Sequence, residues 1–322
     1  MHPLLLPLLL SPLLTHALPT PQNQPGTFPP TGDGTYAGGI FSISLTDLPR
    51  YIPPGPDGGT ETPRADGQRT SGSGPYPAQM TTDPTLPGHT IFAPRTPPAG
   101  NISLPFIAWG NGACVLNPTQ YQNLLTEIAS YGYVIAADGT PNGSSGTEQQ
   151  SKVQDMRESL DWAVAGKAAK YGNVDVQKIT TAGHSCGGLE AMSTAYRDPR
   201  VKRIMMFNIA IFQDEKRYLL QEIKVPVAYL IGGKSDMGYE NSAKDYARLN
   251  PGLPKLRANL DTGHQGTFRA TNGGKQGKAA VAYLEWQWRG NMTARDVILK
   301  PESPGSLVKD NWVVESANWD LV

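Results

Sequence analysis

The chain lacks the features typical of nucleic-acid-binding, membrane-spanning and metal-binding proteins. It has 28 basic and 28 acidic side chains among 322 residues, so no net charge attracts a polyanion and we expect no nucleic-acid partner. No stretch after the N-terminus approaches the ~20 apolar residues of a membrane span, so stable membrane insertion is not expected. Neither a metal-ligand cluster nor a dinucleotide fingerprint occurs, and GGKS at 232–235 lacks the first glycine of a P-loop. We therefore expect no metal and no cofactor.

The N-terminus predicts export from the cell. Residues 1–17 (MHPLLLPLLLSPLLTHA) combine an apolar run with a small-residue site ending at Ala17, as in a signal peptide cleaved after that residue. An N-terminal membrane anchor is the alternative, less favoured at this length. Sequons at Asn101, Asn142 and Asn291 are glycosylation acceptors in secreted proteins. The sequence thus predicts a secreted, extracellular glycoprotein.

Composition divides the rest of the chain into three parts. Residues 18–71 are rich in Pro, Gly, Thr and Ser, which predicts a flexible leader, although the apolar segment at 40–48 could pack on the domain. Residues 72–290 have the size of one domain with a reasonable core. Residues 291–322 form a C-terminal extension expected to pack Trp312 and Trp319 on that domain. No internal repeat is found, and we expect a monomer.

Apolar runs and helical patterns alternate through residues 72–290. Strands buried on both faces are predicted by short continuous apolar runs at 105–109, 133–137, 179–184, 203–208, 227–233 and 255–261. Helices are predicted between them at 118–130, 148–170, 188–197, 239–249 and 275–289. This alternation indicates an α/β fold with a mostly parallel, doubly wound sheet flanked by helices.

A candidate nucleophile lies in the stretch ITTAGHSCGGLEAMS at 179–193. Ser185 has Gly183 two residues before it and Gly187 two residues after it, with a predicted strand before and a helix behind. This is the pattern of a nucleophile elbow in an α/β-hydrolase fold, where small residues allow a tight strand-to-helix turn. A buried structural serine is the alternative interpretation. The pattern predicts Ser185 as a catalytic nucleophile.

A serine nucleophile needs a base, and histidine is the usual one. The chain has only five histidines, at His2, His16, His89, His184 and His264. The first two fall in the predicted signal peptide, His89 precedes the core sheet, and the side chain of His184, next to Ser185, is expected to point away from the cleft. His264 follows a late strand, in the order of this fold, and is predicted to be the base.

The base needs an acid that holds its tautomer, and the fold places that acid after a strand between the serine and the histidine. Asp236 follows the apolar run at 227–233 and is the predicted acid. Other carboxylates lie in the same interval, at Asp214, Glu240, Asp245 and Asp261.

Backbone N–H groups are needed to stabilise the oxyanion. The fold takes one from the residue after the nucleophile, here Cys186, and one from the loop after an early strand. The sequence IAWGNGACV places Gly110, Asn111 and Gly112 in such a loop, and Asn111 is the predicted donor, although a turn without function is the alternative.

The two cysteines lie beside the predicted oxyanion donors. Cys114 and Cys186 would be neighbours if both donors face one oxygen, and in an oxidising compartment they could form a disulfide across a 72-residue loop. Two separate buried thiols are the alternative.

From about Tyr76 to Gly290 the chain resembles secreted α/β-hydrolases of the dienelactone-hydrolase-like, cutinase and polyester-hydrolase group. The resemblance is carried by WGNGAC, LTEIASYGYVIAADGT, GHSCGG, VPVAYLIGGKSD and TGHQGTF. It implies Ser185, Asp236 and His264 as a catalytic triad and Asn111 and Cys186 as oxyanion donors. The polyester-cleaving members have an aromatic residue where this chain has Asn111, so the resemblance leaves the fine specificity open.

These features predict a serine hydrolase that cleaves carboxylic esters through an acyl-enzyme. Residues 209–226 leave room for one helix and no large lid, which indicates an open cleft for small soluble or polymeric esters. Trp109, Phe212 and the loop 142–145 are expected to line that cleft. Two alternatives are an enzyme that opens lactones or transfers acyl groups in secondary metabolism, and a non-catalytic binding module on the same fold.

Overall fold

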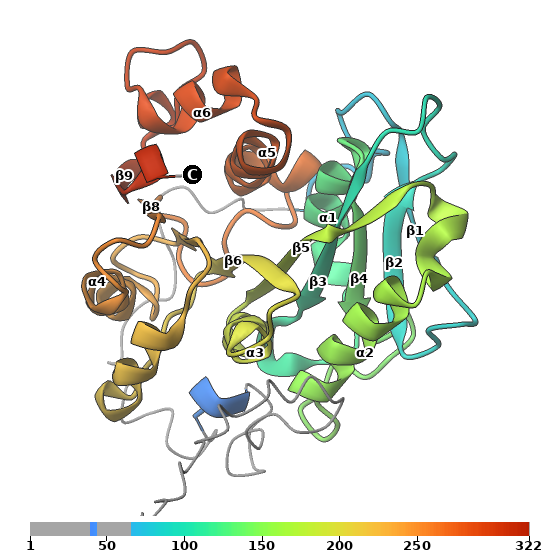
Figure 1. Ribbon diagram of the computed structural model, residues 1–322, viewed down its shortest axis with the longest axis horizontal. Coiled ribbons are helices and arrows are strands. Elements are labelled where there is room, and N and C mark those ends of the chain that lie inside the picture. Colours follow the sequence, from blue (N-terminus) through green and yellow to red (C-terminus); the bar gives the residue numbers. More distant parts are fainter. Residues whose placement is uncertain (1–38, 44–65, 322) are drawn as a thin grey trace, which may run out of the picture.

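The computed structural model describes residues 39–43 and 66–321 (Figure 1). The predicted signal peptide and most of the predicted leader lie outside the described residues, and so does Val322. The described part contains one nine-stranded sheet in the order β1-β2-β4-β3-β5-β6-β7-β8-β9. Neighbouring strands from β4 to β8 are parallel, whereas β1, β2 and β9 pair antiparallel at the two edges. The predicted mostly parallel, doubly wound α/β sheet is confirmed.

The strands are β1 Ala78–Thr82, β2 His89–Pro94, β3 Leu104–Gly110, β4 Val134–Asp138, β5 Val174–His184, β6 Val201–Phe207, β7 Val227–Ile231, β8 Lys255–Asn259 and β9 Val313–Ala317. The α-helices are α1 Gln122–Ser130, α2 Val153–Val164, α3 Cys186–Ala195, α4 Tyr239–Arg248, α5 Gly274–Arg289 and α6 Met292–Leu299. Short 3-10 helices include η1 Gly39–Phe41, η3 Gly112–Cys114, η4 Thr119–Tyr121, η5 Lys167–Tyr171, η6 Asp214–Glu222 and η7 Thr271–Gly273. All six predicted strands and four of the predicted helices are present with bounds shifted by a few residues, whereas the helix predicted at 148–170 is divided into α2 and η5, with Gly166 between them at φ 75°.

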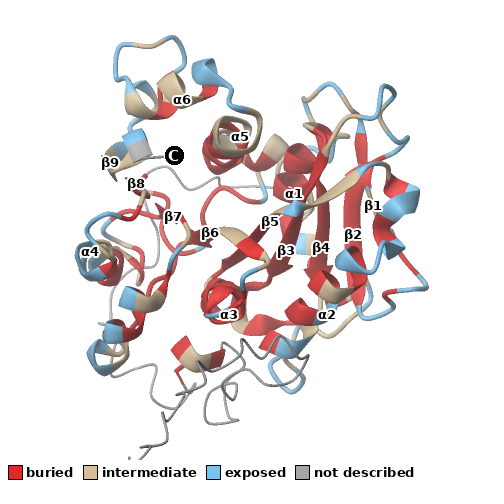
Figure 2. Ribbon diagram, in the orientation of Figure 1, coloured by how far each residue is buried: buried red, intermediate tan, exposed pale blue. Residues whose placement is uncertain are grey.

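Successive side chains of the central strands enter two separate cores. In β3, Phe106 and Ala108 pack with α2 and α3, and Ile107 and Trp109 pack with α1 and α5 on the opposite face. Because alternate residues of a strand point to opposite faces, a strand covered on both sides must be apolar throughout. Figure 2 shows the middle of the sheet largely buried, with the exposed residues mainly at the periphery. The continuous apolar runs are thereby explained.

Elements at the edges of the sheet were not predicted. Strands β1 and β2 extend one edge, and β9 extends the other by pairing with β8. The C-terminal extension therefore contributes a strand and helix α6 to the domain, and Trp312 is only 2% exposed rather than lying on the surface. Trp319 packs on Trp286, with ring centroids 4.6 Å apart.

Two segments of the predicted leader that are described contact the domain. Phe41 is buried, its backbone N–H donates to the Ser193 hydroxyl of α3, and its ring packs edge-on against Tyr196. Asp66 pairs with Arg269, and the Gly67 N–H donates to the Arg269 carbonyl. In the described part of the chain, no helix is both long and apolar enough to cross a bilayer.

Candidate active site

Ser185 lies on a strained turn between β5 and α3. It has φ 53° and ψ −124°, a combination that a non-glycine residue adopts only when its surroundings enforce it. A Cβ on Gly183 would lie 2.2 Å from the Gly187 carbonyl oxygen, and a Cβ on Gly187 would lie 2.0 Å from the Gly110 carbonyl carbon. Glycine is therefore required on both sides of Ser185, which explains the G-x-S-x-G spacing.

A chain of hydrogen bonds connects Ser185 to the predicted base and acid. The Ser185 hydroxyl is 2.9 Å from His264 Nε2, and His264 Nδ1 is 2.9 Å from Asp236 Oδ1. Because a carboxylate can only accept, Nδ1 carries the proton and Nε2 is left to accept the proton of the serine hydroxyl. The structure thus brings together three residues that are far apart in the sequence.

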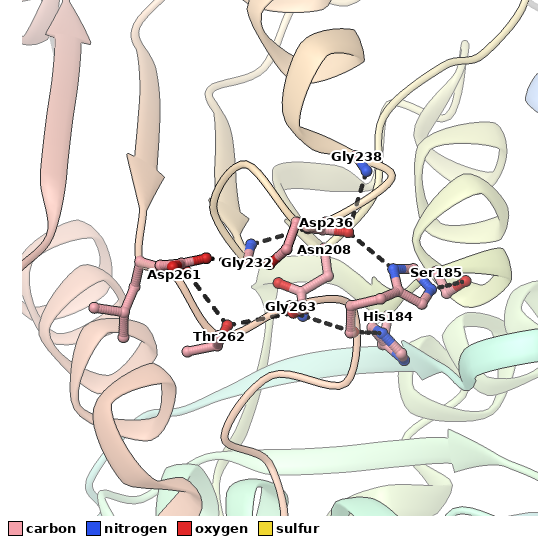
Figure 3. A network of polar contacts seen from close by, with 12 residues as sticks. His184, Ser185, Asn208, Gly232, Asp236, Gly238, Asp261, Thr262 and Gly263 are labelled. Carbon is pink, nitrogen blue, oxygen red and sulfur yellow. Dashed lines mark hydrogen bonds and ion pairs between the residues drawn. The ribbon is translucent and has the colours of Figure 1, made fainter. Parts of the chain in front are cut away.

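Asp236 is held by backbone amides at the end of β7. Its carboxylate accepts N–H groups of Gly232 at 2.9 Å and Gly238 at 3.1 Å, besides the bond from His264 (Figure 3). The competing acids are placed elsewhere. Asp245 pairs with Arg217, and Asp261 accepts from the Ser235 hydroxyl.

The loop after β3 approaches Ser185, but Asn111 is not among the residues that line the cavity there. Asn111 is fully buried, its side-chain amide donates to the carbonyls of Val115 and Asp138, and its own carbonyl accepts from Gly187. Gly112 and Ala113, the next two residues, line the cavity at Ser185. These contacts do not test the backbone N–H of Asn111, so its role as an oxyanion donor stays a prediction, and Ala113 of the same loop lines the cavity.

The disulfide between Cys114 and Cys186 is present, with Cα atoms 5.3 Å apart. It links η3, in the loop after β3, to the first residue of α3, directly behind Ser185. The alternative of two separate buried thiols is excluded.

Tyr121 and His184 form a second hydrogen-bonded chain that the sequence did not reveal. The Tyr121 hydroxyl accepts the Gly112 N–H at 2.7 Å and lies 2.8 Å from His184 Nδ1. His184 Nε2 lies 2.8 Å from the His264 carbonyl oxygen, and the two imidazole centroids are 4.8 Å apart. His184 therefore points under His264 and not away from the cleft, contrary to the prediction.

The direction of these bonds follows from which atoms can donate. A carbonyl oxygen only accepts, so His184 Nε2 carries a hydrogen, and Nδ1 of the neutral ring then accepts the Tyr121 O–H. Burial, together with the proximity of His264, lowers the pKa of His184 well below its usual value and keeps it neutral. Asn208 adds a further bond from its side-chain amide to the His264 carbonyl. The Gly112 N–H and the His264 carbonyl are thus connected through one chain of hydrogen bonds.

A cluster of acids is buried beneath the same loop. Asp138, at the end of β4, and Glu190, in α3, are both fully buried. Burial raises the pKa of Asp138 to about 6, and burial together with the charge of Asp138 raises the pKa of Glu190 well above its usual value. His89 lies 3.3 Å from Asp138, and the Ser151 hydroxyl donates to Glu190 at 3.0 Å. Among the described residues, no cluster of His, Cys, Asp and Glu is arranged to hold a metal ion.

A cavity of about 360 Å³ opens at Ser185. Its lining consists of Gly112, Ala113, Val115, Asn117, Thr119, Gln120, Tyr121, Ser145, His184, Ser185, His264 and Gln265. Ser145 comes from the predicted lining loop 142–145. Trp109 and Phe212 do not line the cavity, since they are 1% and 4% exposed and belong to the cores on either side of the sheet. Both predictions are corrected: these aromatic side chains fill the interior.

The three sequon asparagines are exposed on the domain. Asn101 and Asn142 lie in loops, and Asn291 precedes α6, where its side-chain oxygen caps the helix by accepting the Ala294 N–H. Each position is accessible to modification, which stays a prediction.

A family model for chlorophyllases matches residues 79–211. The match contains the glycine-rich loop and the elbow with Ser185, and it ends before Asp236 and His264. The chlorophyllases are esterases of the α/β-hydrolase type, so the match indicates an ester hydrolase on this fold. No curated protein matches the chain.

Proposed function

We propose that this protein is a serine hydrolase that cleaves carboxylic esters. Ser185 attacks the ester carbonyl carbon while His264 Nε2 takes its proton, and Asp236 stabilises the imidazolium that forms. The same histidine then protonates the leaving alkoxide as the C–O bond breaks, leaving an acyl-enzyme. Water, deprotonated by His264, releases the acid and restores Ser185.

The observation that carries this proposal is the hydrogen-bonded chain Ser185–His264–Asp236, with distances of 2.9 Å at both steps. The strained backbone of Ser185 supports it, since such strain is concentrated at active sites. A buried structural serine would require neither feature.

The oxyanion is assigned to the N–H groups of Ala113 and Cys186. Ala113 lines the cavity, and Cys186 is the first residue of α3, where backbone N–H groups have no partner within the helix. In the described part of the chain, neither N–H has an acceptor among the turn and loop hydrogen bonds. The positive end of the α3 dipole adds to the stabilisation of negative charge.

The finer features of this proposal come from the sequence. The N-terminal segment, the sequons and the disulfide favour a secreted, extracellular enzyme of the cutinase and dienelactone-hydrolase-like group, acting as a monomer on small or polymeric esters without nucleic acid or a cofactor.

Labelling with a fluorophosphonate probe tests the proposal, because only an activated hydroxyl reacts. We expect the probe to attach to the peptide that contains Ser185, and Ser185→Ala to lose p-nitrophenyl acetate turnover by about 10³-fold or more. A variant at the half-buried Ser303, Ser303→Ala, is the control and should keep both properties, because Ser303 is not among the residues that line the cavity. Absence of labelling, as expected of a binding module, or full turnover by Ser185→Ala would overturn the proposal.

A further inference from the structure

The rim of the cavity at Ser185 is polar and uncharged. Gln120, Ser145 and Gln265 lie in the connections that follow β3, β4 and β8, with Gln120 in η4, and all three are exposed. No Asp, Glu, Lys or Arg lines the cavity. In the described part of the chain, the side chains of Ser145 and Gln265 make no hydrogen bond to protein groups, whereas Gln120 uses its Nε2 on Tyr121. Neutral donors and acceptors therefore surround the nucleophile on three sides.

Few aliphatic side chains line the cavity. Ala113 and Val115 are the aliphatic side chains of the lining, and Val115 is only 7% exposed. The large hydrophobic side chains that are exposed in the described part of the chain are Val164, Tyr218, Met292, Val308 and Val313, and none of them lines the cavity. A long alkyl chain or an apolar film would therefore find no large exposed hydrophobic side chain in the cavity lining on which to bind.

The energetics favour a ligand with hydroxyl groups. Amide and hydroxyl side chains both donate and accept hydrogen bonds, as alcohol hydroxyls do, so a hydroxyl-rich ligand replaces the water that it displaces from the rim. An apolar ligand bound over the same side chains displaces the water from them and offers them no hydrogen-bond partner. The volume of about 360 Å³ is at the lower end for small-molecule sites, which favours a short acyl group.

We infer that the site cleaves esters between a short acyl group and a neutral, hydroxyl-rich alcohol such as a sugar or another polyol. The inference rests on the proposed function and adds its substrate class. The short acyl group lies against Ala113 and Val115, and the alcohol meets the polar rim. Hydrolysis consumes one water molecule and releases the carboxylic acid and the polyol.

A matched pair of substrates tests this inference. Methyl 6-O-acetylglucoside and cyclohexylmethyl acetate both carry an acetylated primary alcohol on a six-membered ring, but only the glucoside has ring hydroxyls. We expect kcat/KM for the glucoside to be higher by about 10-fold or more, because its ring hydroxyls would form a few hydrogen bonds with the rim on binding. In a p-nitrophenyl series we expect acetate to be cleaved faster than octanoate.

Variants connect this preference to the rim. We expect Gln265→Leu to lower the ratio of the two kcat/KM values by about 3- to 10-fold, the effect of one hydrogen bond. Gln177→Leu is the matched control, because Gln177 is also an exposed glutamine but lies in the N-terminal half of β5, away from the cavity, and it should leave the ratio unchanged.

The outcomes separate this inference from the proposed function. A labelled Ser185 together with a preference for cyclohexylmethyl acetate or for octanoate would overturn the substrate class alone, as would an unchanged ratio in Gln265→Leu. Failure of the fluorophosphonate to label Ser185 would overturn both proposals.

Discussion

At the scale of single residues, the site depends on the direction of its hydrogen bonds. The Tyr121 hydroxyl accepts from Gly112 and donates to His184, and His184 donates to the carbonyl of His264. The loop that faces the oxyanion and the loop that carries the base are therefore coupled through two buried side chains. His184 and Tyr121 are positioning residues, since their polar atoms contact protein groups and not the reacting serine oxygen.

Tyr121→Phe tests this coupling. The change leaves the Gly112 N–H and His184 Nδ1 without their partner, and we expect kcat to fall about 10-fold and stability to fall by about 1–3 kcal/mol. Tyr283→Phe is the control, because the Tyr283 hydroxyl is buried with no hydrogen-bond partner in the described residues, and its removal should leave kcat unchanged. Steady-state kinetics and thermal melts measure both variants. Equal kcat values for Tyr121→Phe and the wild type would contradict the coupling.

Removing the acid and removing the base should lower kcat by different factors. Asp236→Asn keeps the shape but favours the wrong tautomer of His264, and we expect kcat to fall by about 10⁴-fold. His264→Ala removes the base itself, and we expect a loss of about 10⁶-fold. Burst and steady-state kinetics on p-nitrophenyl acetate would reveal the order, and the reverse order would indicate another acid.

At the scale of elements, helix α3 and the loop after β3 form one unit. The disulfide joins them, and the Gly187 N–H donates to the Asn111 carbonyl at 2.9 Å. The two N–H groups of the proposed oxyanion site, from Ala113 and Cys186, are thereby fixed relative to Ser185. The elbow glycines permit this contact, since any side chain at 187 would collide with the backbone of Gly110.

The disulfide should stabilise the domain measurably. Its two cysteines are 72 residues apart, and a crosslink over that length is worth about 4 kcal/mol in the chain-entropy account. We expect a reducing agent to lower the melting temperature of the wild-type protein. A double variant, Cys114→Ala with Cys186→Ala, should melt at a lower temperature and show no response to the reductant. An unchanged melting temperature of the wild-type protein after complete reduction would show that the disulfide does not stabilise the domain.

At the scale of the whole molecule, two buried acids influence stability. Asp138 and Glu190 belong to elements packed in the centre of the domain, and both have a raised pKa because burial penalises their charge. A raised pKa means that the folded state binds the proton more tightly than the unfolded state. The contribution of these two acids to stability is therefore greatest below the pKa of the unfolded carboxyls and falls as pH rises toward the folded values.

Glu190→Gln removes one of these titrations. Glutamine keeps an oxygen that can accept from Ser151, and it has no charge to bury, so the variant should lose less stability with rising pH. For one such group, each pH unit between the unfolded and folded pKa costs about 1.4 kcal/mol. We expect the melting temperature of the variant minus that of the wild type to be larger at pH 8 than at pH 5. The exposed Glu158→Gln is the control and should show no such trend.

The sequence was sufficient for the central sheet and for the residues of the hydrogen-bonded chain. Strands buried on both faces are apolar throughout, and this pattern is visible without coordinates. The edge strand β9 was missed because it has no such pattern: none of its five residues is buried, and Val313 is 63% exposed. Trp109, near the end of β3, and Phe212, after β6, were misplaced because an aromatic residue near the end of a strand has the same local pattern whether it fills a core or lines a cleft.

The sequence alone determined which serine could be the nucleophile and which histidine could be its base. The spacing of glycines around Ser185 is a local property of the chain, and the few histidines can be counted and compared without coordinates. Only the tertiary structure decided that Ala113 lines the cavity, that His184 supports His264, and that the rim is neutral and polar. The physical reason is that burial and hydrogen-bond direction arise between residues distant in the chain, and no local pattern encodes which atoms will meet.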